Sequence, residues 1–286
     1  MFRFWLALAL LIAPAGMAKA VDGLAGGVPE TLTTLPPLEH LAHELRGGDG
    51  SPGGRRSLGA GNNAHGSALD PGAVRAVNDA DLVFWVGPGL EPGIARLADE
   101  DPKFVKLGEA PGVTTRQLPN GASDPHVWLA PANALVMADA ITEAYVRTDP
   151  ERAALYRANR ERLGDRIEAT EREWQGRLAP LSGRAYVVAH DAFGYFTEAM
   201  GLDEAIVVTA GEHADAGARR LREVIAEARE RDATCLIVEP GSNGRLARTL
   251  GLREVTIDPL GTELPDYPAL IEAVGRGFEE CLSDAS

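Results

Sequence analysis

The residues YVVAHDAFGYF at positions 186–196 are the best starting point for predicting the fold. Tyr186 to Ala189 form a short apolar run, and His190 ends it. A run that is apolar on both faces is typical of a strand buried in a parallel sheet. A histidine at the carboxyl end of such a strand lies at the crevice where open α/β sheets bind ligands. The stretch therefore predicts a buried strand and a binding position.

Four further apolar runs follow this pattern, and amphipathic helical stretches lie between them. The runs are residues 82–86, 206–208, 235–238 and 255–257. Buried strands that alternate with helices predict an α/β fold with parallel sheets flanked by helices. Polar residues recur just past the strand ends, at the edge where ligands bind.

Residues 149–180 interrupt the alternation, because they contain no strand pattern. Asp149 is a candidate N-cap, Pro150 takes the first helical position, and Pro180 ends the segment. The spacing predicts one helix of about 28 residues with a single apolar stripe. The stripe consists of Tyr156, Leu163, Ile167, Thr170, Trp174 and Leu178. We interpret this helix as a rigid connector between two α/β lobes; one helix of a single larger domain is the alternative.

The first twenty residues form a separate unit. Arg3 precedes a short apolar run at residues 4–13, and Ala18-Lys19-Ala20 fits the small-x-small rule for signal-peptide cleavage. Pro14 and Gly16 interrupt the run before it reaches the length of a membrane-spanning helix. No cysteine lies near the cleavage site, so we expect a periplasmic protein without a lipid anchor. The predicted division is a signal peptide at 1–20, an N-terminal lobe at 21–148, a connecting helix at 149–180 and a C-terminal lobe at 181–286.

Composition restricts the partners of the chain. It has 286 residues, with 42 acidic and 28 basic side chains and a net charge of −14. This balance argues against nucleic acid, which needs clustered Lys and Arg. The two cysteines, Cys235 and Cys281, are too few for a disulfide scaffold or an all-cysteine zinc site. Export permits a disulfide between them, and two separate buried thiols are equally compatible with the sequence.

Three histidines and one aspartate could hold a metal together. His65 and His126 lie in loops, and His190 and Asp258 directly follow apolar runs. Taken singly, each residue is more often structural, as a histidine bonded to the backbone or an aspartate that caps a helix. Three imidazole nitrogens and one carboxylate oxygen form a four-coordinate set that suits Zn²⁺. Two of these residues precede the long helix and two follow it, so a metal would bridge the lobes.

The other histidines carry weaker signals. His40 and His43 lie three residues apart and could share a helix face, which would allow a two-histidine metal site. No third ligand is visible near them, so we interpret them as surface residues. His213 is also interpreted as a surface residue. The glycine-rich residues 47–61 are predicted to form a flexible loop before His65.

The chain resembles the zinc-binding members of the cluster A-I family of metal-specific ABC-transporter solute-binding proteins. Six stretches carry this resemblance in the family's order: LTTLPPL at 32–38, HGSALDPGAVRAVNDADLVFWVGPGLE at 65–91, DPHVWLAP at 124–131, YVVAHDAFGYF at 186–196, ATCLIVEP at 233–240 and TIDPLGTEL at 256–264.

The resemblance implies a function and a set of site residues. His65, His126 and His190 fall on the family's histidine ligands, and Asp258 falls on its carboxylate ligand. The third ligand of the family is typically His in zinc importers and Glu in manganese importers, so His190 favours zinc. The resemblance also implies a Cys235–Cys281 disulfide. It further implies a monomer that delivers Zn²⁺ to a membrane permease powered by an ATPase. The His-rich loop that zinc members often carry is absent from residues 112–123.

Three alternatives remain open at this point. A protein of the same family could bind Mn²⁺ or Fe²⁺. A metallochaperone could pass zinc to a soluble periplasmic partner. A secreted zinc hydrolase could use three histidines and a water, but the chain has no H-E-x-x-H motif and no motif for a serine or cysteine nucleophile. We therefore expect a binding protein and not an enzyme.

Overall fold

The structure is a computed structural model that describes residues 28–48, 57–58, 69–98, 100–118, 121–209 and 217–283. The predicted signal peptide lies outside these residues. The elements in chain order are β1 (Thr31–Thr33), α1 (Pro36–Arg46), α2 (Pro71–Asp79), β2 (Leu82–Trp85), α3 (Pro92–Ala98), β3 (Phe104–Lys106), η3 (Leu107–Glu109), η4 (Val127–Leu129), α4 (Pro131–Thr148), η5 (Pro150–Arg152), α5 (Ala153–Leu178), η6 (Ala179–Leu181), β4 (Val187–His190), α6 (Gly194–Met200), β5 (Ile206–Thr209), α7 (Ala218–Glu230), β6 (Cys235–Val238), α8 (Arg245–Leu250), β7 (Arg253–Thr256) and α9 (Tyr267–Leu282).

The first sheet has the order β1-β2-β3, and all its strands are parallel. Both faces of the central strand are apolar. Val83 and Trp85 belong to a buried cluster with side chains of α2 and α3. Phe84 lies on the opposite face, where its ring meets that of Tyr145 from α4 edge to face at 5.6 Å. Helices therefore cover this sheet on both sides, as a parallel sheet requires.

The second sheet has the order β5-β4-β6-β7 and is also parallel. Val187 and Leu236 pack with side chains of α7 and α8, whereas Val188 and Ile237 face the main core. The register places His190 beside Thr209 at the carboxyl end of the sheet. The predicted α/β class with two parallel sheets is thus confirmed.

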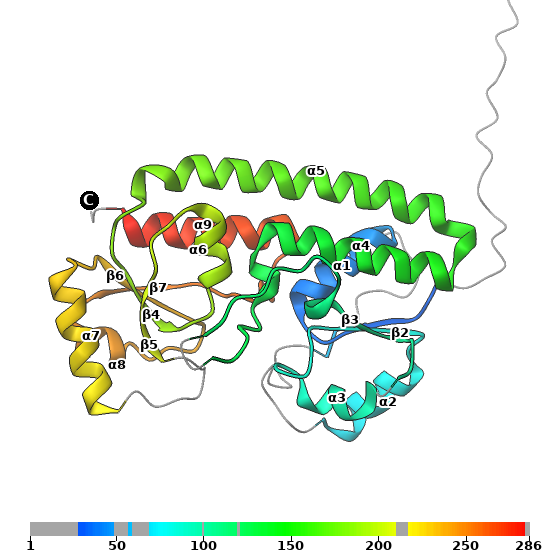
Figure 1. The fold of residues 1–286 in the computed structure, drawn as a ribbon, viewed down its shortest axis with the longest axis horizontal. Coiled ribbons are helices and arrows are strands. Elements are labelled where there is room, and N and C mark those ends of the chain that lie inside the picture. Colours follow the sequence, from blue (N-terminus) through cyan, green and yellow to red (C-terminus); the bar gives the residue numbers. More distant parts are fainter. Residues whose placement is uncertain are drawn as a thin grey trace, which may run out of the picture.

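The long helix α5 spans 26 residues and passes over both halves of the molecule (Figure 1). It lies against α4 and α9, and one continuous buried cluster contains residues from both lobes, such as Leu41 of α1 and Phe278 of α9. The fit is close where α5 meets α9, because a Cβ added at Gly275 would lie 2.3 Å from the Trp174 ring. The connector is therefore packed along the core and is not a free-standing rod.

The start of the long helix differs from the prediction. α5 begins at Ala153, after a short 3-10 turn at Pro150–Arg152. Asp149 makes no side-chain cap. Its carboxylate accepts hydrogen bonds of 2.7 Å from both Arg152 Nη1 and the hydroxyl of Tyr156. The sequence pattern predicts that this carboxylate accepts hydrogen bonds from backbone amides in the first turn of the helix. In the structure these two side-chain donors bind it instead.

The prediction that His40 and His43 lie on the surface is wrong. Only 2% of His40 and 4% of His43 is exposed. The cause is the position of α1, which packs against α4, α5 and α9 and also against β1. The pattern of polar and apolar residues in α1 places His40 and His43 on its polar face, which in an isolated helix would face solvent. Here the neighbouring elements cover that polar face as well.

Two strands of the first sheet have no counterpart in the predicted runs. β1 and β3 contain three residues each. Ser57, from the glycine-rich stretch, forms a single parallel bridge with Thr33, and the Leu58 amide donates to the Thr33 carbonyl over 2.9 Å. Most of that stretch lies outside the described residues, and so does His213.

Cys235 of β6 and Cys281 of α9 form a disulfide, with their Cα atoms 5.5 Å apart. It ties the last helix to the second sheet. Of the helices in the described part of the chain, none combines the length and the apolar character that crossing a membrane requires.

Candidate metal centre

Two of the four predicted ligands meet between the lobes. His126 lies in the loop before η4, and His190 ends β4. Their ring centroids are 5.0 Å apart with an interplanar angle of 70°. Both side chains are buried. Two imidazoles bound to one tetrahedral zinc, at Zn–N distances of about 2.0–2.1 Å, have their centroids about 5 Å apart, so this spacing suits a shared metal ion.

A buried carboxylate orients the first of these rings. His126 Nδ1 lies 2.8 Å from Asp124 Oδ1, and the same oxygen accepts a 3.0 Å hydrogen bond from the His126 amide. Because a carboxylate accepts, Nδ1 carries the proton in the neutral imidazole. The Nε2 atom is then the nitrogen with a lone pair for a metal, which is the usual carboxylate–histidine arrangement at zinc sites.

The second ring has the same kind of partner from a different element. His190 Nδ1 lies 2.7 Å from Glu239 Oε1, and Glu239 directly follows β6. The neighbouring strands β4 and β6 thus bring the histidine and its carboxylate together at one sheet edge. Neither Asp124 nor Glu239 is assigned a role by the sequence patterns. For Asp124 the available signal is its place two residues before His126. Glu239 directly follows the strand that pairs with that of His190, a placement that depends on the strand order.

Asp258 lies in the loop after β7 and is half-buried. Its Oδ1 accepts from the Leu260 amide and its Oδ2 from the Thr262 amide, each over 2.9 Å. The next residue, Pro259, accepts a 2.9 Å hydrogen bond from the Trp128 indole. The loop therefore lies against η4, the turn that follows His126.

The fourth predicted ligand, His65, lies outside the described residues. Within the described ranges, no three His, Cys, Asp or Glu side chains are grouped closely enough to hold a metal ion. The structure therefore brings His126 and His190 together, places Asp258 in a nearby loop, and does not describe His65.

The surroundings of the two imidazoles are acidic. Burial raises the pKa of Asp191, and the negative charge of Asp124 raises it further, while Arg116 and the two histidines act in the opposite direction. Carboxylates at positions 124, 191 and 239 thus lie around the histidine pair. A concentration of negative charge at a cleft favours a cation.

A loop from the N-terminal lobe reaches across to α6 beside this site. Arg116 Nη1 donates to Asp124 Oδ2 over 3.1 Å, and the Arg116 amide donates to the Tyr195 hydroxyl over 2.8 Å. That hydroxyl in turn donates to the Asp124 carbonyl over 3.0 Å. A Cβ at Gly194 would lie only 1.4 Å from Arg116 Nη1, so any larger residue there would force the guanidinium to move. Asp124 is consequently held by both lobes.

A separate buried carboxylate lies at the carboxyl edge of the first sheet. Glu91 accepts hydrogen bonds from the amides of Val86 and Gly87 and from the hydroxyl of Thr34. Burial raises its pKa to about 7, although the three hydrogen bonds act to lower it. Glu91 connects the ends of β1 and β2.

Comparisons with known proteins agree with this architecture. The family model described as ZnuA, zinc-uptake complex component A, periplasmic, matches residues 32–281. The high-affinity zinc uptake system protein ZnuA of Paracoccus denitrificans is 30% identical, over 95% of this chain and 97% of the relative. A crystal structure of ZnuA aligns with a TM-score of 0.76 at 23% identity, covering 88% of this chain and 98% of the other. A manganese-bound periplasmic metal-binding protein from Candidatus Liberibacter asiaticus aligns with a TM-score of 0.75 at 17% identity, covering 88% and 99%. At these identities the two structures show a shared fold only.

Proposed function

Because the chain belongs to the ZnuA family of periplasmic zinc-uptake components, we propose that it captures Zn²⁺ between its lobes and delivers it to the permease and ATPase of an ABC transporter. The family is a metal-binding transport component and not an enzyme, which argues against the zinc hydrolase.

One observation carries the proposal, namely the pairing of His126 with His190. Each ring has its Nδ1 atom on a carboxylate, so the same nitrogen of each is assigned to the metal. The proposed ligand set is completed by His65 and Asp258. Three neutral imidazoles and one carboxylate around Zn²⁺ leave a net charge of about +1, and the surrounding carboxylates offset this charge.

The choice of metal rests on the donor atoms and not on the fold. The manganese-bound neighbour and the ZnuA crystal structure align with this chain almost equally well, so the fold does not discriminate between the metals. A ligand set with three imidazoles favours zinc, whereas manganese prefers sites richer in oxygen. The Mn²⁺ or Fe²⁺ alternative is therefore the second candidate.

Location and domain division complete the proposal. A signal peptide at residues 1–20 is removed on export, and a monomer without a lipid anchor works in the periplasm. Residues 21–148 form the N-terminal lobe, 149–180 the connecting helix and 181–286 the C-terminal lobe. The family description as periplasmic supports this location.

A titration among metals tests the proposal. Metal-free protein is competed against a chromophoric chelator with Zn²⁺, Mn²⁺ and Fe²⁺, and we expect zinc to bind most tightly. His126→Ala and His190→Ala should each weaken zinc binding by about 100-fold or more, because about 10–16 kcal/mol of zinc binding energy is shared among four ligands. His213→Ala removes a histidine outside the proposed set and is the control. Wild-type zinc affinity in both site variants would disprove the assignment.

A further inference from the structure

The loop that carries Asp258 belongs to the C-terminal half of the chain, but its hydrogen bonds reach the N-terminal half. Pro259 accepts from the Trp128 indole over 2.9 Å. His40 Nε2 donates to the carbonyl oxygen of Gly261 over 3.0 Å. These two donors are 131 and 221 residues distant from their acceptors in the chain. The Asp258 loop, residues 258–262, is therefore held from outside at two points.

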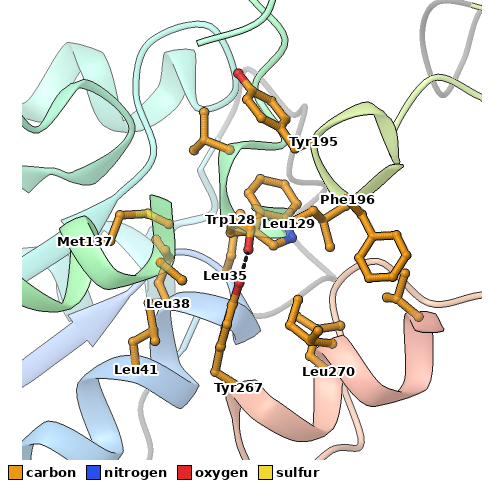
Figure 2. Close-up of a cluster of buried hydrophobic side chains, with 14 of the residues drawn as sticks. Leu35, Leu38, Leu41, Trp128, Leu129, Met137, Tyr195, Phe196, Tyr267 and Leu270 are labelled. Carbon is orange, nitrogen blue, oxygen red and sulfur yellow. Dashed lines mark hydrogen bonds between the residues drawn. The ribbon is translucent and has the colours of Figure 1, made fainter. Parts of the chain in front are cut away.

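The two donors are themselves firmly placed. Trp128 is 1% exposed, and its carbonyl accepts a 2.7 Å hydrogen bond from the Tyr267 hydroxyl (Figure 2). Figure 2 also shows Leu38 and Leu41 in the same buried hydrophobic cluster as Trp128, on α1, the helix that carries His40. His40 is 2% exposed. Neither donor can shift without disturbing the core.

The Asp258 loop has a fixed internal shape that transmits this restraint. Both carboxylate oxygens of Asp258 accept from amides of their own loop, at Leu260 and Thr262. Gly261 has a φ of +59°, in the left-handed region, and a Cβ there would lie 3.0 Å from Leu270. Leu260 and Thr262, whose amides bond the Asp258 carboxylate, are the two chain neighbours of Gly261. A shift of the Gly261 carbonyl therefore also shifts the Asp258 carboxylate.

From this geometry we propose that His40 is a positioning residue for Asp258, and that its hydrogen bond to Gly261 sets the place of that carboxylate relative to His126. The inference rests on the proposed function, in which Asp258 is a metal ligand. It also gives His40 a role other than the two-histidine metal site considered from the sequence. A carbonyl oxygen only accepts, so His40 Nε2 carries a proton and has no lone pair for a metal.

Two substitutions at position 40 separate the hydrogen bond from the bulk of the side chain. In His40→Gln the amide nitrogen is as many bonds from Cα as the imidazole Nε2, so the variant keeps a donor at that distance. His40→Leu fills the buried space without a donor. We expect His40→Leu to weaken zinc binding by about tenfold, the lower end of the range for groups that orient metal ligands. His40→Gln should bind within about threefold of wild type. His43→Leu removes the other buried histidine of α1 and serves as the control with unchanged affinity.

A double-mutant cycle decides whether His40 acts through Asp258. Zinc affinities are measured by chelator competition for wild type, His40→Leu, Asp258→Ala and the double variant, each checked for folding by its melting temperature. If His40 acts through Asp258, the double variant binds no more weakly than Asp258→Ala. A further tenfold loss in the double variant, or wild-type affinity in His40→Leu, overturns the inference. Failure of wild type to bind zinc would instead overturn the proposed function, and the inference with it.

Discussion

Replacing Glu91 by glutamine should change how the stability of the protein depends on pH. The Glu91 pKa is about 7 in the folded chain, against an ordinary value of 4.5. Below pH 4.5 the carboxyl is protonated in both states. Between pH 4.5 and 7 the unfolded chain loses this proton while the folded chain keeps it, so the free energy of unfolding falls as the pH rises. At about 1.4 kcal/mol for each tenfold change in proton affinity, the full loss is about 3 kcal/mol.

Glutamine matches the protonated form of this side chain. Its amide oxygen can accept from the Val86 and Gly87 amides, as Oε2 of Glu91 does over 2.9 and 2.8 Å. Its NH₂ group can donate to the Thr34 hydroxyl, which bonds the other oxygen. The variant should therefore fold with these contacts, losing only the longer 3.2 Å hydrogen bond from the Val86 amide to Oε1, and it should lack the titration.

Urea unfolding at pH 4.5 to 8, followed by tryptophan fluorescence in the presence of a chelator, measures the effect. The difference in unfolding free energy between Glu91→Gln and wild type should grow by about 3 kcal/mol in favour of the variant across this range. Glu143→Gln, at an exposed position of α4, is the control, and its curve should run parallel to wild type. Parallel curves for Glu91→Gln would show that the carboxyl is not held protonated by burial, and the reasoning would be refuted.

Three further predictions concern the site, the core and the disulfide. Asp124→Asn removes the charge that faces the first imidazole and should weaken zinc binding by about 10- to 100-fold in a chelator competition, with a folded far-UV spectrum. Gly275→Ala should destabilise the protein by about 1–3 kcal/mol in urea unfolding, because its Cβ overlaps the indole ring of α5, whereas Gly176→Ala, with open space around its Cβ, should be neutral or stabilising. Replacing Cys235 and Cys281 together by alanine opens a loop of 46 residues and should cost about 4 kcal/mol of unfolding free energy, so an unchanged urea midpoint would contradict a role for the bond.

The parts of the fold that follow from sequence are those fixed by local pattern. β2, β4 and β6 coincide closely with continuous apolar runs, because strands buried on both faces have no polar alternation. β1 and β3 could not be found in this way. They have three residues each, and β1 contains two threonines that are buried in the structure. Their strand state is imposed by pairing with β2, which is a long-range contact.

The same distinction applies to the candidate site. His126 and His190 could be selected because strand ends and loop positions are visible in the sequence. The long-range hydrogen bonds that orient and restrain the site could not. Glu239 reaches His190 across 49 residues, and His40 reaches Gly261 across 221. Neither pairing follows from spacing, because each depends on how strands and lobes are placed in three dimensions.

These cross-connections constrain how a bound ion could leave. The two sheets share one buried cluster. The Asp258 loop is hydrogen-bonded to Trp128 and His40, so we expect it to move together with His126. His190 and Glu239, by contrast, are fixed to β4 and β6 of the second sheet. A wide hinge motion would expose the common core and break both loop hydrogen bonds at once, at a cost of roughly 1 kcal/mol per hydrogen bond before the apolar area is counted. Small shifts of the second-sheet edge against the His126–Asp258 side would separate the two histidines without exposing the core, and would strain the hydrogen bonds of Tyr195 with the Arg116–Asp124 loop. Release by local movement is therefore the route that this arrangement of contacts favours.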